Sequence, residues 1–524
     1  MLAYFPAVGA EELRVRSAFD FVRAHGYVTF PDHPPARLSP PRLSPDYLVG
    51  DTRDFWSWDL SQMPPHDVLV PSTCRAVGTN AYIFVADDQF GFNVSQQDVD
   101  NILDVLDNVT PAGSIDPAKG IIPNEVDVFG PVPDELDGDP KPIILLMELQ
   151  SFGGNQFDGF FNAYNQYTDD YTVAHYGYHS NECEMVTVNS AIRPVVSDMT
   201  ISILAHEFQH LIHWGGDPEE ESWVNESCSE AAMVICGYHT DIDWLNDYLS
   251  NPSASLYDLE HVHYGACLLF GTYLYERFGA GFLNTLVADP THGQTGVTGS
   301  LGASGNPLSM DELLLDWATA TVGDHLGAID PRYSHPLIPV GAPAMVSQVV
   351  AYPLDPSLQR NLVETGAAYV RLAAPAGNAD VVLDLQSQPE GHLQARVLMV
   401  DGSGNAITTE FSQGEATVPF AENPQIDSAY LVMVASIGGQ VSYTLTAETA
   451  SDGEDGGVAD AADGGDVSDT DTDADAYDGG TGADESTGNG DGGCGCGHNN
   501  TFGTPLLFLV LFLLCPRLRY AVGR

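Results

Sequence analysis

The run Ile201-Ser-Ile-Leu-Ala-His206-Glu207-Phe-Gln-His210-Leu-Ile-His213-Trp214 decides how the first half of the chain is interpreted. Its apolar residues recur at intervals of one, three and four, which is the pattern of a half-buried helix. On a helix of about 3.6 residues per turn, His206 and His210 stand one turn apart on one face. Both imidazoles can then reach one zinc ion at about 2 Å. We therefore predict a zinc-binding helix, with Glu207 beside the ion and placed to handle water.

A third protein ligand is needed, because a zinc hydrolase keeps one coordination position open. His213 and Glu226 compete for this role. The metzincin pattern requires Gly three residues after the second His and another His three further on, but His213 and Gly216 occupy those positions. Glu226 fits better, because residues 225–230 would form a second helix packed beside the first. His213 shares a face with His210, and we expect it to be a lining or surface histidine.

Two further carboxylates have expected roles. Glu207 is the predicted general base, which takes a proton from the attacking water and later passes one to the leaving amine. Glu230 stands one helical turn after Glu226. From there it can accept the outer N–H of a ligand histidine and so determine the tautomer of that ring.

This arrangement of ligands is similar to that of the gluzincin metallopeptidases, whose zinc sites are organised as in thermolysin. The segments His206-Glu-Phe-Gln-His-Leu-Ile-His and Trp223-Val-Asn-Glu226 most resemble the hyicolysin family and the neighbouring immune-inhibitor-type secreted bacterial proteases. The resemblance covers roughly residues 74 to 325. At Ser227-Cys228 the chain departs from the Gly and small apolar residue expected there, although the ligands are intact. The resemblance implies a two-lobed, thermolysin-like catalytic domain.

A gluzincin also needs a group that stabilises the negative charge developing on the substrate carbonyl. Related gluzincins take this group, a Tyr or His, from a later helix. The resemblance makes Tyr264 the first candidate for a catalytic residue of this kind, with His261 and His263 as alternatives. The competing interpretation is that Tyr264 only packs at the start of a helix and has no catalytic role.

Composition divides the 524 residues into five segments, and the predicted fold class is α+β. Residues 1–60, rich in Pro and Arg, form a lead-in or propeptide-like segment, and residues 61–335 form the metallopeptidase domain. Alternating apolar and polar runs in residues 345–449 predict an all-β sandwich domain. Residues 450–493 are an acidic linker that cannot bury enough apolar area to fold. Residues 494–524 form a C-terminal sorting or anchor segment.

The C-terminal segment joins Cys494-Gly-Cys496-Gly to an apolar run and terminal arginines. The apolar run, 505–515, is shorter than the roughly 20 residues of a membrane-spanning helix. This order resembles the myxobacterial C-terminal sorting tag, which implies processing at Cys494 or Cys496 and export to the surface or medium of a Gram-negative bacterium. The N-terminus lacks the basic and long apolar regions of a signal peptide, so we expect its start to be truncated or misassigned.

The charge balance excludes one class of partner. With 18 Lys+Arg against 73 Asp+Glu, the net charge is −55, which would repel the phosphates of nucleic acid. The excess acid indicates solubility or association with Ca²⁺ instead. The eight cysteines include no CxxC pair, so they predict neither a zinc finger nor a thioredoxin-like site. A disulfide or two among the first five would be compatible with export, but the pairing is open.

Together these features predict an exported, zinc-dependent metalloendopeptidase that hydrolyses peptide bonds through a zinc-activated water. Its partners would be protein or peptide substrates, with membrane contact only through the C-terminal segment, and we expect a monomer. The alternative is a cell-surface binding or adhesion protein whose metal site is structural or inactive. A third interpretation is a zinc hydrolase that acts on a non-peptide amide.

Overall fold

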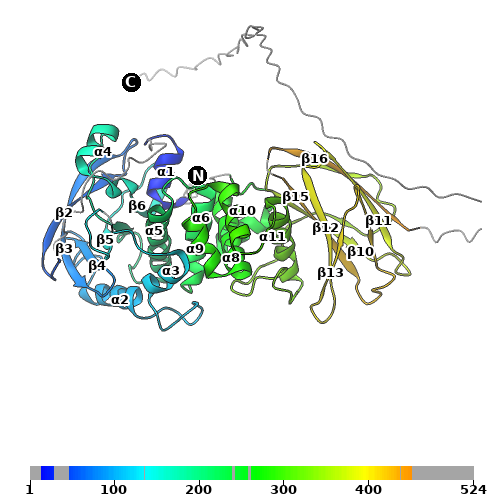
Figure 1. The fold of residues 1–524 in the computed structure, drawn as a ribbon, viewed down its shortest axis with the longest axis horizontal. Coiled ribbons are helices and arrows are strands. Elements are labelled where there is room, and N and C mark those ends of the chain that lie inside the picture. The colour runs from blue at the N-terminus through cyan, green and yellow to red at the C-terminus, as the bar shows by residue number, and fades with distance from the viewer. Residues whose placement is uncertain are drawn as a thin grey trace, which may run out of the picture. The chain divides into compact units, whose positions relative to one another are not determined.

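The computed structural model describes residues 13–28, 46–134, 136–238, 242–257, 261–436 and 438–450. The predictions for the acidic linker and for the processing cysteines Cys494 and Cys496 fall outside these residues. The described part mixes helices with several sheets, which is compatible with the predicted α+β class (Figure 1). No helix within these ranges is both long and apolar enough to cross a membrane.

A mixed seven-stranded sheet forms the N-terminal part, in the order β1-β6-β7-β5-β4-β3-β2. Its strands are β1 (Leu13–Ser17), β2 (Thr52–Asp59), β3 (His66–Val77), β4 (Tyr82–Ala86), β5 (Ile143–Met147), β6 (Asn155–Phe161) and β7 (Met185–Asn189). The central strands β4, β5 and β7 run parallel and are buried along their whole length, which explains their continuous apolar sequences. Because β1 and β2 both belong to this sheet, the predicted boundary at residue 60 does not coincide with a break in it.

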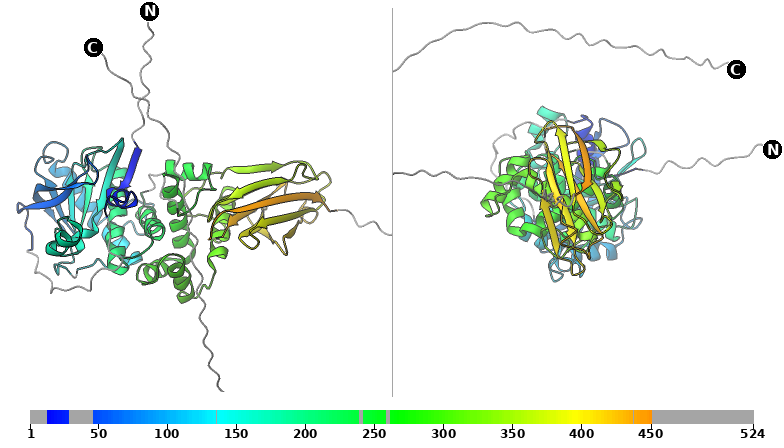
Figure 2. Two further views of the ribbon diagram at one scale, coloured as in Figure 1. Left: turned by 90° about the horizontal axis from the view of Figure 1, so that it is seen from above. Right: turned by 90° about the vertical axis from the view of Figure 1, so that its right-hand side faces the viewer.

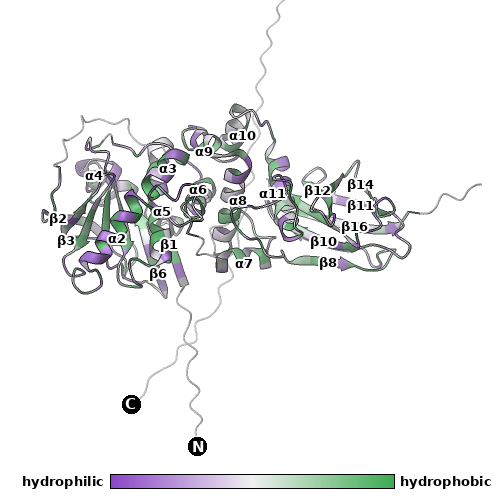
Figure 3. Cartoon of the chain, turned by 90° about the horizontal axis from the view of Figure 1, so that it is seen from below, coloured by the Kyte–Doolittle hydropathy of each residue, from purple (hydrophilic) through white to green (hydrophobic). Residues whose placement is uncertain are grey.

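The helices that accompany this sheet are α1 (Ala18–Ala24), α2 (Gln96–Asp107), α3 (Ile121–Phe129) and α4 (Asp169–Tyr176), with a 3-10 turn η1 (Ala163–Gln166). Helix α2 shows both hydrophobic and hydrophilic residues in Figure 3, as an amphipathic helix should. It buries Val99, Ile102 and Leu106. A capping box between Ser95 and Asp98 begins this helix by satisfying two of its first N–H groups.

A series of helices follows the sheet: α5 (Asp198–Gly216), α6 (Ser222–Ile235), α7 (Ile242–Ser250), α8 (His261–Phe278), α9 (Ala280–Val287), α10 (Gly293–Ala303) and α11 (Met310–His325). Helix α5 packs against β6 and β7 on one side and against α6 on another. Gly159 of β6 permits this approach, because a Cβ there would lie 3.0 Å from Cγ2 of Ile203 and 3.3 Å from Cγ of Glu207. The sheet therefore contacts the side of α5 that carries Glu207.

Helices α6 and α8 approach each other closely at Gly271, where an added Cβ would lie 1.8 Å from the backbone oxygen of Ser227. We expect Gly271→Ala to lower the free energy of unfolding by about 3 kcal/mol, because the obstructing atom belongs to the backbone. Denaturant unfolding measures this change. The matched control is Gly302→Ala on α10, where an added Cβ meets nothing within 4 Å and should be neutral or slightly stabilising. Equal stability of both variants would contradict the close crossing.

Residues 345–449 form two sheets, with orders β13-β12-β15-β10-β8 and β14-β11-β16-β9 (Figure 2). The strands are β8 (Met345–Val349), β9 (Leu358–Leu362), β10 (Ala367–Ala373), β11 (Val381–Gln388), β12 (Leu393–Val400), β13 (Ala406–Glu410), β14 (Glu415–Val418), β15 (Ser428–Ala435) and β16 (Val441–Thr449). Buried residues of both sheets share one apolar core, so the sheets form a sandwich. Helix α11 packs on β12 and β15, where buried Asp316 accepts hydrogen bonds from Arg332 and Arg396.

The cysteines of the described part are reduced. Five thiols are free and buried: Cys74, Cys183, Cys228, Cys236 and Cys267. The disulfides that export would permit are therefore not formed among these residues. Burial raises the pKa of the Cys74 thiol to about 11 and that of Cys183 to about 12. These two side chains act as small apolar groups in the core rather than as nucleophiles.

Candidate metal centre

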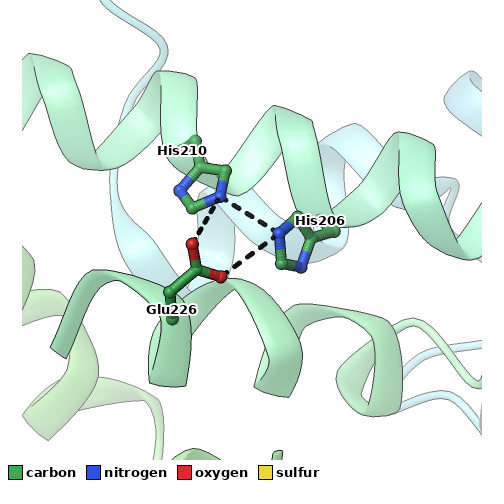
Figure 4. Close-up of side chains that lie close together, drawn as sticks. All are labelled: His206, His210 and Glu226. Atoms are coloured by element: carbon green, nitrogen blue, oxygen red, sulfur yellow. Dashed lines mark hydrogen bonds and ion pairs between the residues drawn. The ribbon is translucent and has the colours of Figure 1, made fainter. Parts of the chain in front are cut away.

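The structure brings His206 and His210 of α5 together with Glu226 of α6 (Figure 4). Nε2 of His206 lies 3.1 Å from Nε2 of His210 and 3.5 Å from Oε2 of Glu226. Nε2 of His210 lies 3.9 Å from Oε1 of Glu226. The ligand atoms of a tetrahedral zinc site, each about 2.0–2.1 Å from the ion, are about 3.3 Å apart. The separations found are close to this value, and the buried group could hold a metal ion.

The outer nitrogens of both imidazoles meet oxygen atoms, which orients the rings. Nδ1 of His206 lies 3.3 Å from Oε1 of Glu230. Nδ1 of His210 lies 3.0 Å from Oγ of Ser229 and hydrogen-bonds to Oδ1 of Asn225. A histidine whose Nδ1–H donates to oxygen presents the lone pair of Nε2. When Nδ1 carries the proton in each ring, both Nε2 atoms offer their lone pairs toward the Glu226 carboxylate, which is the form that binds a cation.

Glu230 is completely buried and has a cationic partner that comes from the N-terminal strand. Nε of Arg16, on β1, donates to Oε1 of Glu230 at 3.2 Å, and both side chains are inaccessible to solvent. The Arg16 guanidinium also lies 4.5 Å from the centre of the Trp244 ring. Burial raises the pKa of the Glu230 carboxyl, while Arg16, His210 and His263 lower it. Arg16 thus supplies positive charge to a carboxylate that orients His206.

We expect Arg16→Gln to weaken metal binding by about 10- to 100-fold, the usual effect of removing an outer partner of a metal ligand. The loss arises because removal of Arg16 raises the pKa of the buried Glu230 carboxyl further, and a neutral carboxyl holds the His206 ring less firmly. Competition with a chromophoric chelator measures the affinity. Arg14→Gln on the same strand is the control, since Arg14 pairs with Asp158. Recovery of affinity in Arg16→Lys would show that the charge is what matters, whereas equal losses in the Arg14 and Arg16 variants would contradict this role.

Glu207, the predicted general base, is buried between α5 and β6. Its Oε2 accepts the backbone N–H of Phe161 at 2.8 Å. This hydrogen bond holds the carboxylate of the residue that directly follows His206 in the sequence. A carboxylate in this position needs to reach a water next to the metal, and apo structures often show such contacts before they tighten.

His213 is not part of the group that could hold the metal. It is buried on α5, and its Nδ1 lies 3.4 Å from Nε2 of Gln209. Burial, and then the nearby His210, lower the pKa of His213 to about 3. His213 is therefore a neutral core residue that lies beside the ligand helix.

Tyr264 and His263, on α8, face different neighbours. The Tyr264 ring lies 5.0 Å from the ring of Trp244. His263 is buried, its Nε2 lies 3.3 Å from Sγ of Cys267, and its charge lowers the pKa of Glu230. His263 therefore interacts with Glu230 of the ligand helix α6, whereas the ring of Tyr264 contacts Trp244 of α7. The side chain of the other alternative, His261, lies outside the described part.

A cavity of about 40 Å³ lies beside His210. This volume admits water. Its wall comes from α1, β6, η1, α5, α6 and the segment between α5 and α6, through Phe19, Arg23, Phe161, Ala163, His210, Trp214, Pro218, Glu220, Ser222 and Asn225. The presence of Phe19 and Arg23 shows that the N-terminal helix forms part of the site.

Sequence reasoning did not identify Arg16, Asn225 or Ser229 as partners of the centre. Asn225 and Ser229 lie on either side of the predicted ligand Glu226 in the sequence. Their helical spacing places them on the side of α6 that faces His210, so the sequence does contain a signal for these two residues. Arg16 is 214 residues from Glu230 along the chain, and nothing in the local pattern of β1 indicates the contact.

The group that could hold a metal thus consists of side chains from two adjacent helices, with oxygen atoms close to the outer nitrogens of both imidazoles. Two imidazoles and one carboxylate are the donor set that the structure brings together. In comparisons with known proteins, no family model and no curated protein matches this chain.

Proposed function

We propose that the protein is an exported zinc metalloendopeptidase with a gluzincin-type, thermolysin-like catalytic domain. One observation carries the proposal: the Nε2 atoms of His206 and His210 lie 3.1 Å apart, and each lies 3.5 to 3.9 Å from an oxygen of the Glu226 carboxylate. Glu207 directly follows the first ligand in the sequence. Imidazole and carboxylate donors in a small buried group suit zinc. The remaining coordination position would be open to water and substrate.

Bound zinc would polarise the scissile carbonyl and lower the pKa of water. The protein's own residues supply the rest. Glu230 and Asn225 hold the two imidazoles in the orientation needed for binding, and Glu226 adds the negative charge that neutral imidazoles lack. Glu207, held by the Phe161 N–H, accepts a proton from the attacking water and returns it to the leaving amine. His263 and Tyr264 are the candidates for stabilising the oxyanion.

The cavity beside His210 is large enough for water but not for a peptide. A peptide that reached the centre through this cavity would require wall side chains such as Phe19 and Arg23 to move. Both belong to α1, whose removal or displacement would open one side of the cavity. This requirement assigns α1 a part in substrate access.

The same observation favours a second candidate function, in which the metal centre is structural. All three donors are buried, and the cavity beside them is small. A structural ion would tie α5 to α6, and the β-sandwich of residues 345–449 would then bind a surface partner. Proteolysis distinguishes the two functions, because only the first predicts that the protein cleaves casein or gelatin.

The experiment is metal analysis of the purified full-length protein, combined with casein cleavage before and after treatment with a zinc chelator. The expected result is at least one zinc per chain, cleavage that stops when zinc is removed, and recovery on addition of zinc. Cleavage that continues at the original rate in metal-free protein would overturn the proposal. Zinc content without any cleavage of casein or gelatin would favour the structural role.

A further inference from the structure

A second group of metal-ligating side chains lies beyond the C-terminal end of α5. Asp217 follows the last residue of α5, Glu220 lies in the segment between α5 and α6, and His292 directly precedes α10. One ligand atom from each lies within 4.8 Å of the others. The two acidic side chains are buried, with exposed fractions of 4% for Asp217 and 3% for Glu220, whereas His292 is partly open to solvent.

The Glu220 carboxylate has one satisfied and one unsatisfied oxygen. Its Oε1 accepts the backbone N–H groups of Gly293 at 2.7 Å and Glu221 at 2.6 Å. Its Oε2 is buried and has no hydrogen-bond partner among the described residues. A buried carboxylate oxygen without a partner costs free energy that a bound cation would recover. This oxygen is the observation that separates the group from an ordinary acidic cluster.

The histidine of the group is held on both sides by carboxylates. Nδ1 of His292 lies 2.9 Å from Oδ2 of Asp217, and Nε2 lies 3.6 Å from Oε2 of Glu219. The 2.9 Å contact is a hydrogen bond, whose proton a metal ion bound between the two atoms would replace. Imidazole is a ligand for zinc and similar metals, whereas Ca²⁺ takes oxygen ligands. The donor set therefore selects a zinc-type ion over the Ca²⁺ that the acidic composition suggests.

Gly293 brings α10 close to this segment. Its φ is +58°, and an added Cβ would lie 2.4 Å from Cδ of Glu221. Only glycine allows the first N–H of α10 to reach the Glu220 carboxylate in this conformation. The close packing places His292 against Asp217, so the three ligands converge from two separate parts of the chain.

We propose that Asp217, Glu220 and His292 bind a second divalent metal ion of the zinc type, which fastens the start of α10 to the segment joining the two ligand helices. That segment runs from Asp217 to the start of α6 at Ser222, so it sets how far His210 stands from Glu226. Glu220 also lines the cavity beside His210. The second ion would hold the first centre in place without contacting substrate. This role does not depend on peptidase activity.

The test is the zinc content of the full-length protein after loading with Zn²⁺ and gel filtration, with each variant checked by circular dichroism for a native fold. Wild type is expected to bind two zinc ions, and Glu220→Gln and His292→Gln one each. Glu148→Gln is the control: it removes the same charge at an exposed position that follows β5, outside the group of three, and should keep two ions. Glu226→Gln should also leave one ion, but at the second site, so the double variant Glu220→Gln/Glu226→Gln should bind none.

A proton is the alternative occupant, because burial raises the pKa of Glu220 to about 7. If a proton rather than a metal resides there, Glu220→Gln will keep the zinc content of wild type, and the proposal is overturned. Wild type that binds a single ion, lost in Glu226→Gln, overturns it as well. Displacement of the second zinc by millimolar Ca²⁺ overturns the choice of metal. If instead Glu226→Gln leaves the content unchanged while Glu220→Gln lowers it, the proposed peptidase centre fails and the second site stands.

Discussion

Replacing Glu207 by glutamine is expected to lower the rate of casein cleavage by about 10²- to 10⁴-fold, the usual contribution of a general acid–base residue. Glutamine has nearly the shape of glutamate but cannot take a proton from water. Its side-chain oxygen can still accept the Phe161 N–H that Oε2 of Glu207 accepts now. The fold and the metal ligands should therefore remain, and only the proton transfer is lost.

Zinc content and steady-state kinetics on the same preparation separate this effect from metal loss. The matched control is Glu148→Gln, since Glu148 is an exposed residue that follows β5 and lies outside the metal centre. The control should cleave casein at the wild-type rate. A Glu207→Gln variant that binds zinc and cleaves casein as fast as wild type would remove Glu207 from the mechanism and leave the structural role of the metal as the better account.

The ligand helices were predictable because their signals are local. The apolar periodicity of residues 201–214 predicts a helix, and α5 extends it to Asp198–Gly216, with the side chain of Ser197 accepting the Thr200 N–H at its start. A helical spacing of four fixes which side chains share a face, so the convergence of His206 and His210 follows from the sequence alone. The placement of Glu226 needed one more step, the packing of α6 against α5.

The N-terminal strands could not be predicted in the same way. The sequence suggested an extended lead-in up to residue 60, but β1 pairs with β6 and β2 pairs with β3. Strand β6 follows Gly153 and Gly154, and its sequence NQFDGFF does not alternate, so only its partners on both sides define it as a strand. The contact of Arg16 with Glu230 depends on this long-range pairing, and for that reason no local pattern reveals it.

The residue that would stabilise the oxyanion could not be predicted from the sequence for a different reason. Tyr264 and His263 are adjacent on α8, so their side chains project about 100° apart around the helix axis. Which of the two faces the ligand helices depends on the rotation of α8 about its own axis. That rotation is set by packing, including the close approach of Gly271 to Ser227 of α6. A sequence resemblance to a family motif does not determine the rotation of α8 about its axis.

Replacing Glu226 by glutamine is expected to weaken zinc binding by more than about 100-fold, which exceeds the loss caused by removing an outer partner of a ligand. The neutral amide is a poor ligand for zinc and removes the negative charge that His206 and His210 do not provide. Casein cleavage should disappear with the metal. Competition with a chelator of known affinity measures the loss, while zinc bound by Asp217, Glu220 and His292 is distinguished by its persistence.

The order of zinc affinities among several variants tests the assignment of the third ligand more stringently than any single affinity. If Glu226 binds the metal and Glu230 only orients His206, then Glu226→Gln must lose more affinity than Glu230→Gln, for which about 10- to 100-fold is expected. His213→Gln should have the smallest effect of the three, because His213 is a neutral core residue outside the group of donors. The reverse order, with affinity lost in His213→Gln and kept in Glu226→Gln, would make His213 the third ligand and would require α5 to change its geometry on binding metal.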